Sequence, residues 1–204
     1  MQKSKSRRRR PALLFVLPIL TACVTDNSIL LADNLCAAKT SQQPDQAKYL
    51  GQALAYLKAN PGAHRVTDPC KELTFLSERV DDLRQKHIRF QQSYYGVPVW
   101  GQLLLVHLNA DNVATSTTGS IQPITQKISV EPKLAKTIAI NTAASAVGEG
   151  GKAQDSQLYV YMHDGAPRLV HMITIMKSLR RTMVFVDAET GLVLNQISAS
   201  PSQN

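Results

Sequence analysis

The chain has 204 residues and a formal net charge of +8, a length sufficient for one or two small domains. A strongly basic chain is a candidate for nucleic-acid binding, but six of its 23 Lys and Arg residues lie within residues 3–10, before the first acid, Asp26. Without residues 1–22 the net charge falls to +2. We therefore expect no nucleic-acid partner.

The N-terminal residues have the order of a secretory signal. The basic residues stand directly before an apolar run, Pro11–Leu20, and small residues follow it. The run is too short to span a bilayer of roughly 30 Å as a stable anchor. We predict that residues 1–22 are a signal peptide and that the protein is exported.

The end of this signal, Leu20-Thr21-Ala22-Cys23, resembles a bacterial lipobox, in which the leader is cut before a Cys that becomes acylated. The alternative is an ordinary cleavage site with a chance Cys. The resemblance implies a lipoprotein signal and an acylated Cys23 that holds the protein on a bilayer of the bacterial cell envelope. Val24 is not an acid, which by resemblance to sorting signals favours the outer membrane, facing the periplasm.

The other two cysteines, Cys36 and Cys70, form an even pair in an exported chain, and we predict a disulfide between them. The crosslink would stabilise the fold by roughly 3–4 kcal/mol in the entropic model. The alternative is two unpaired thiols. Neither Cys has a second Cys or His at close ligand spacing, and we expect no metal and no other cofactor.

The N-terminal part of the chain is predicted to begin with a tether and a helix. Residues 23–45 are mostly polar and would connect the lipid to the fold. Residues 45–60 carry apolar residues at helical spacing, and Pro61-Gly62 would end the helix. Residues 73–84 are ambiguous, because their apolar residues slightly favour a helix but also fit a strand.

Three short strands with two turns follow. Residues 87–94 alternate apolar and polar, residues 99–108 are strongly apolar, and residues 113–118 return to end at Gly119. Tyr95-Gly96-Val97-Pro98 is predicted to form the first turn and residues 109–112 the second.

The C-terminal part is predicted to be one helix on an antiparallel sheet. Residues 123–130, with Pro123 and Pro132 close by, are the candidate domain boundary. Residues 132–147 form the predicted helix, which Gly148 ends. Four strands are predicted at 158–162, 168–176, 182–186 and 192–197, and residues 199–204 are a polar tail. The sequence thus predicts an α+β fold of two small domains, each an antiparallel sheet packed with helix.

The stretch HIRFQQSYYGVPVWG, residues 87–101, with the apolar strand and turn LLVHLNADN after it, resembles the fungalysin/thermolysin propeptide domain. The family also has this order of His, Arg, two Gln, Tyr and a Gly-Val-Pro-Val turn. One departure is Asp82-Leu83-Arg84, which lacks the Gly usual in the preceding turn. The resemblance implies strand, turn and strand across residues 73–94. The matching residues are His87, Arg89, Gln91, Gln92, Tyr94, Gly96, Val97, Pro98, Val99, Gly101 and His107.

The second part resembles a PepSY domain, with VFVDAETGLVL as its most specific piece. The resemblance places a propeptide-like domain at 46–122, with its preceding helix, and a PepSY-like domain at 123–198. In thermolysin-like proteases this pair forms the propeptide, which is implied to help the protease fold and to inhibit it.

The sequence carries no catalytic motif of such a protease. A zinc protease of this family needs two His at i and i+4 on a helix with a Glu between them. No His here is followed by Glu, and no two His stand four residues apart. We therefore predict a protein that is not an enzyme.

Some polar and aromatic residues of the propeptide-like part are candidate partner-binding residues. His87, Arg89 and Gln91 share one strand face, which would either fix the following turn or face a partner protease. Tyr94, Tyr95 and Trp100 flank the turn, either as core residues or as exposed anchors of an interface. His107 in its apolar strand is expected to be a hydrogen-bonded structural residue, and Asp187 and Gly191 to form a hairpin turn.

The leading hypothesis is a lipoprotein that binds a thermolysin-like metalloprotease in trans, as inhibitor or folding chaperone. One alternative is an envelope structural or ligand-binding lipoprotein without a protease partner. Another is the pro-region of a truncated zinc metallopeptidase.

Overall fold

A computed structural model describes residues 48–199, and it confirms the predicted α+β class. One mixed sheet of eight strands runs in the order β1-β2-β3-β5-β6-β7-β8, with β4 paired to β3. Neighbouring strands are antiparallel except β3 and β5, which pair in parallel at Val99 and Val160. The elements are α2 (Leu50–Ala59), α3 (Pro61–His64), α4 (Pro69–Glu72), β1 (Leu73–Val80), β2 (Lys86–Tyr94), β3 (Val97–Leu108), β4 (Ala114–Gly119), α5 (Lys136–Val147), β5 (Lys152–His163), β6 (Ala166–Lys177), β7 (Arg180–Asp187) and β8 (Val193–Ala199).

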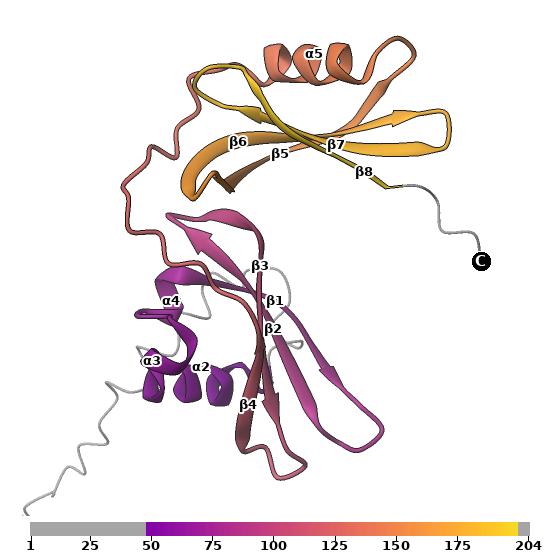
Figure 1. The fold of residues 1–204 in the computed structure, drawn as a ribbon. Helices are drawn as coiled ribbons and strands as arrows, with labels where there is room; N and C mark the ends of the chain where they lie inside the picture. The colour runs from indigo at the N-terminus through magenta and orange to yellow at the C-terminus, as the bar shows by residue number, and fades with distance from the viewer. Residues whose placement is uncertain (1–47, 200–204) are drawn as a thin grey trace, which may run out of the picture.

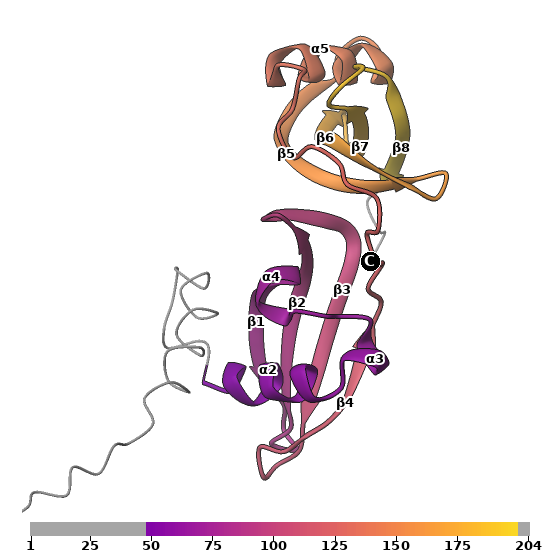
Figure 2. The ribbon, with the colours of Figure 1, turned by 90° about the vertical axis from the view of Figure 1, so that its left-hand side faces the viewer.

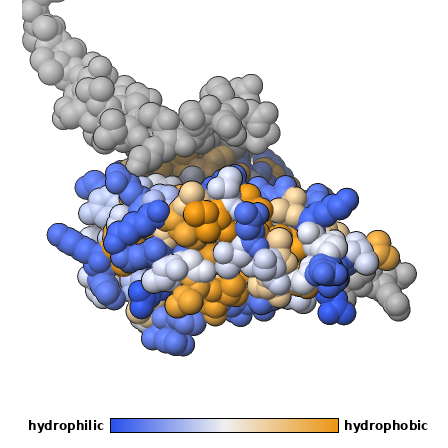
Figure 3. Space-filling view, turned by 90° about the horizontal axis from the view of Figure 1, so that it is seen from above, coloured by the Kyte–Doolittle hydropathy of each residue, from blue (hydrophilic) through white to orange (hydrophobic). Residues whose placement is uncertain are grey.

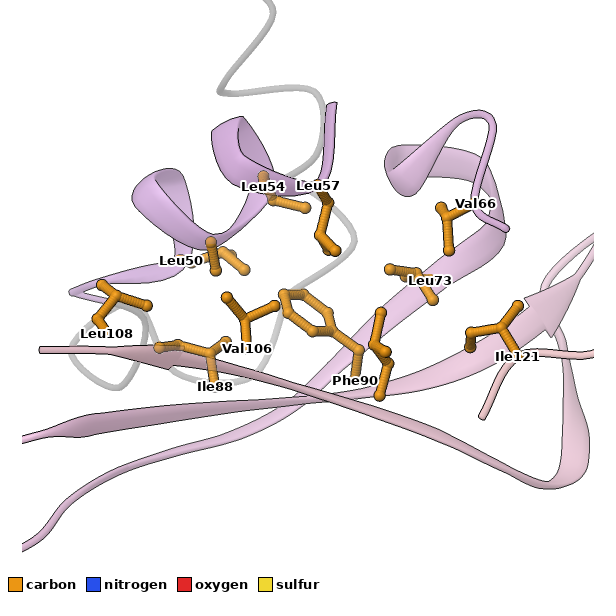
Figure 4. Packing of buried hydrophobic residues seen from close by; sticks show 12 residues of the cluster. Leu50, Leu54, Leu57, Val66, Leu73, Ile88, Phe90, Val106, Leu108 and Ile121 are labelled. Carbon is orange, nitrogen blue, oxygen red and sulfur yellow. The ribbon is translucent and has the colours of Figure 1, made fainter. Parts of the chain in front are cut away.

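The N-terminal half, residues 48–122, packs three short helices against one face of β1–β4 (Figures 1 and 2). Phe90 of β2 lies at the centre of this core, between the sheet and α2, and contacts Phe75 edge to face with ring centroids 6.5 Å apart (Figure 4). Because alternate residues of a strand point to opposite faces, β2 sends Ile88 and Phe90 inward. The buried cluster comprises Leu50, Ala53, Leu54, Leu57, Val66, Leu73, Ile88, Phe90, Leu104, Val106, Leu108 and Ile121.

The C-terminal half, residues 123–199, has buried side chains on both faces of its strands. On one face α5 presents Ala139 and Ala143, both fully buried against a cluster from β6 and β7. The small side chains let the helix approach the sheet closely. On the other face Phe185, Val170 and Met172 form a further cluster. Seen from above, over α5, hydrophobic residues lie among hydrophilic ones on the outer surface (Figure 3).

The predicted helices differ at their ends from those observed. Within the described residues the first helix begins at Leu50, and Pro61 opens a second short helix instead of ending the helical segment. The helix predicted over 132–147 begins at Lys136. The reason is that the amides of Lys133 and Leu134 both donate to the carbonyl of Ala188, which keeps this segment extended along the β7–β8 turn.

The ambiguous segment 73–84 forms strand β1, as the resemblance implied, and not the helix that its spacing slightly favours. Leu73 is buried and Phe75 packs against the core, whereas Leu76 and Val80 are about half exposed. A helix would have turned Leu73, Leu76 and Val80 to the same side. The observed burial is that of a strand at the edge of a sheet.

The other strands were predicted correctly, and all but β4 are longer than expected. The turn at Asp187 is confirmed: its Oδ1 accepts hydrogen bonds from the amides of Glu189 and Thr190, and Gly191, at φ 79°, donates to its carbonyl.

Candidate interaction surface

A row of hydrogen-bonded polar side chains lies on the face of the N-terminal half opposite its helices. His87 Nε2 is 3.0 Å from Asp81 Oδ2, and His87 Nδ1 is 2.8 Å from Nδ1 of His107, directly opposite in the β2–β3 register. His107 Nε2 is 2.9 Å from the Thr118 hydroxyl. The row thus joins the β1–β2 turn to β2, β3 and β4.

Proton positions in this row follow from its chemistry. With both imidazoles neutral, His87 donates from Nε2 to the Asp81 carboxylate and accepts at Nδ1 from His107, whose Nε2 accepts from Thr118. Every ring nitrogen then has a partner. Two protonated rings would instead place two N–H groups against each other across 2.8 Å.

The pKa values reflect these contacts. The hydrogen bond from His87 is the main cause that lowers the pKa of the Asp81 carboxyl. Burial, and then the nearby His87, lowers the pKa of His107. The geometry and the charges therefore both favour an ionised Asp81 beside neutral His107. The expectation that His107 is a hydrogen-bonded structural residue is confirmed.

Gln91, two residues beyond the exposed Arg89, holds a large bulge in β3. Ser93 pairs with Pro98 but Gln91 pairs with Leu103, so β3 places residues 99–102 opposite Gln92 alone. The Gln91 amide donates to the carbonyls of Val99, at 2.6 Å, and Gln102, at 2.8 Å. Gly101, at φ 75°, lies in the bulge, where positive φ suits a residue without Cβ. Gln91 therefore ties together backbone carbonyls at the two ends of the bulge.

The bulge turns Trp100 away from the N-terminal half and towards the C-terminal half. Its ring lies edge-on to Tyr159 and Phe185, with centroids 5.1 and 5.0 Å apart. Beside it, Val99 makes the parallel pair with Val160. Trp100 is thus a packing residue between the two halves, the core alternative of the two left open by the sequence.

Tyr94 and Tyr95 lie at the tight β2–β3 turn. Tyr95 and Gly96 both have positive φ, the backbone that a two-residue hairpin turn requires. The Tyr94 hydroxyl accepts a hydrogen bond from the amide of Ile128 in the connector. Tyr95 stacks edge-on against Tyr94 and is 77% exposed. The turn therefore offers one large aromatic side chain to solvent.

Sequence reasoning missed Asp81 and Thr118 as members of the polar row. Asp81 stands in a turn and Thr118 in a short polar strand, and neither residue has a signature of its own. Cys36 lies outside the described residues, so the Cys36–Cys70 disulfide stays a prediction; Cys70 packs partly buried beside the N-terminal core. Cys23 and the signal at 1–22 also lie outside them.

Two further observations apply to residues 48–199 only. No group of three or more His, Cys, Asp or Glu side chains in this range is placed to hold a metal ion. None of the helices there is long and apolar enough to cross a membrane.

The sheet that carries this surface is similar to a known family motif. Residues 71–121 match the profile of the Fungalysin/Thermolysin Propeptide Motif, a range that contains all of β1–β4. The resemblance to this family is therefore confirmed for this part of the chain.

Two similar proteins are a bacillolysin and a neutral protease. Bacillolysin of Brevibacillus brevis is 32% identical over 54% of this chain and 24% of its own length. Neutral protease B of Bacillus subtilis (strain 168) is 25% identical over 78% of this chain and 31% of its own length. The chain thus spans about a quarter to a third of the length of these relatives.

A solved structure, the C-terminal domain of Bacillus megaterium YpeB, is similar at 16% identity and a TM-score of 0.41, covering 76% of this chain and 64% of that one. This similarity is too low to carry an argument about function. The resemblance of residues 123–198 to a PepSY domain stays a prediction.

Proposed function

We propose that this chain is a non-catalytic, propeptide-like protein that binds a thermolysin-like metalloprotease in trans, as an inhibitor or as a folding chaperone. One observation carries the proposal: the propeptide motif at 71–121 coincides with β1–β4, which have a helix-covered core of their own. The motif is therefore a folded unit that could engage a partner.

The proposed binding surface is the open face of β2–β4 together with the β2–β3 turn. It offers the exposed Arg89, the row from His87, and the aromatic side chains of Tyr94 and Tyr95. Arg and Tyr are enriched among residues that dominate the affinity of protein interfaces. Gln91 and Trp100 would act indirectly, because one holds the β3 bulge and the other packs against the C-terminal half.

We also propose that residues 46–122 and 123–198 are separate domains. Each half has its own buried clusters, and strand pairing between the halves is limited to the one parallel pair at Val99 and Val160. In this proposal an acylated Cys23 and the tether 23–45 would hold both domains at the envelope membrane.

The test uses the chain from residue 24 onward, which keeps every described residue, mixed with mature thermolysin and, separately, with denatured protease that is being refolded. Inhibition would appear as a saturable loss of peptidase activity, and chaperoning as a higher yield of active protease. No effect on any thermolysin-like protease would contradict the proposal and favour an envelope protein without a protease partner.

A charge reversal locates the surface. Arg89→Glu on the open face should weaken the inhibition or the chaperoning of the protease about tenfold or more, as expected for an interface anchor. Lys58→Glu makes the same change in charge on the exposed side of α2, behind the same sheet, and should leave it unchanged. Equal loss in both variants would contradict the assignment of the face.

A further inference from the structure

The β6–β7 hairpin ends in an apolar tip surrounded by cations. Leu179 at the apex is 80% exposed, the highest value among the exposed large hydrophobic residues of the described chain. Lys177 and Arg180 pair across the hairpin directly beneath it, and Arg181 pairs with Met176 one step further down. The hairpin projects beyond the C-terminal end of α5 (Figure 1).

The strand register places these cations on both faces of the hairpin. Lys177 and Arg180 are directly opposed and therefore lie on the same face. Thr182 also lies on this face, because it is two residues from Arg180. Arg181 and Lys152, which pairs with Met176 from the neighbouring strand, lie on the reverse face. The tip is thus an apolar residue with basic side chains around it.

A hollow of about 580 Å³ lies on the α5 side of the hairpin, where the strands continue past the end of the helix. Its lining includes Lys177, Arg180, the hydroxyls of Thr182 and Ser198, and the Gln196 amide. These are hydrogen-bond donors and cations, the groups that bind phosphate oxygens. The acidic residue nearest in sequence to the C-terminal end of α5 is Glu149, which lies just beyond the helix.

We propose that this hairpin docks on the surface of an anionic phospholipid bilayer. Leu179 enters the boundary between headgroups and acyl chains, and the cations around it contact lipid phosphates, with one headgroup in the hollow. An apolar residue carried by a basic surface is the combination that binds such interfaces. The ladder of β6 and β7 holds the tip in place before it binds, so little ordering is needed. The proposal does not depend on the proposed protease partner or on an acyl chain at Cys23.

The test measures partition of the chain from residue 24 onward into vesicles of phosphatidylcholine with and without phosphatidylglycerol. Binding is expected only to the anionic vesicles and should weaken as salt is added. Arg180→Gln should reduce the partition coefficient about fivefold, since each basic residue near the surface contributes by about that factor. Leu179→Ser should reduce it at least as much.

The matched controls lie at the opposite end of the same strands. Leu192→Ser removes an exposed Leu, 64% exposed, in the β7–β8 turn, and Arg168→Gln removes an exposed Arg near the β5–β6 turn. Both should bind as the parent chain does. All four positions are at the surface, and thermal unfolding monitored by circular dichroism checks that each variant folds.

Three results would overturn the proposal. One is equal binding to neutral and anionic vesicles, or none. The second is equal loss in the tip variants and the controls. The third is binding that inorganic phosphate abolishes at matched ionic strength while Leu179→Ser has no effect, which would indicate a site for free anions instead of a bilayer surface.

Discussion

The two halves of the sheet differ in how many of their faces are buried. In the N-terminal half, helices cover one face and leave a hydrogen-bonded polar row on the other. In the C-terminal half, α5 covers one face and Trp100 of the N-terminal half packs on the other. A sheet covered on both faces has little surface left for a partner, whereas a sheet covered on one face keeps the other available. This difference is why we place the partner surface on β2–β4.

The largest effect should come from the face of the C-terminal half that does not contact α5. Phe185→Ala removes a fully buried ring between Trp100 and Tyr161 and should lower the free energy of unfolding by about 3–5 kcal/mol. Arg89→Ala on the open face should change it by no more than about 0.5 kcal/mol. Urea denaturation measures both. Similar losses in the two variants would show that the open face is covered as well.

A smaller effect is expected at the contact between the halves. Trp100→Ala removes a partly buried side chain and should cost about 1.5–3 kcal/mol. Because the parallel pairing of β3 and β5 is short, removing the Trp100 side chain should also split one calorimetric unfolding transition into two. Tyr95→Ala removes an exposed aromatic side chain and serves as the control. A single sharp transition in Trp100→Ala would contradict the proposal of two domains.

The strands and their order along the chain could be predicted because alternation and turn residues are local signals. Phe90 and Ile88 were correctly assigned to one face of β2, and the turns at Gly96 and Gly191 follow from residues that tolerate positive φ. The start of α5 could not be predicted, since it depends on the Ala188 carbonyl, over 50 residues away in the sequence.

The polar row could not be predicted for a similar reason. Continued from the turn at Tyr95-Gly96, a regular hairpin would place His87 opposite Leu104. The β3 bulge shifts the register by three residues, and His87 meets His107. Nothing in the local pattern gives the size of the bulge. The same shift places Trp100 against the C-terminal half, so its role as a packing residue could not be predicted either.

The smallest effect concerns pH and tests the contribution of His107 in the polar row. A His with a lowered pKa binds fewer protons folded than unfolded, so its contribution is present above the ordinary His value of about 6.5 and is lost as pH falls. Asp81, whose pKa is also lowered, loses its contribution at lower pH, as it is protonated. Stability of the N-terminal half should therefore fall on acidification.

The variant His107→Gln tests this expectation. Its side chain keeps a donor for His87 and an acceptor for Thr118 but does not titrate. The urea midpoints of this variant should therefore vary less between pH 7 and pH 5 than those of the parent chain. An unchanged slope in His107→Gln would show that the polar row does not cause the acid sensitivity.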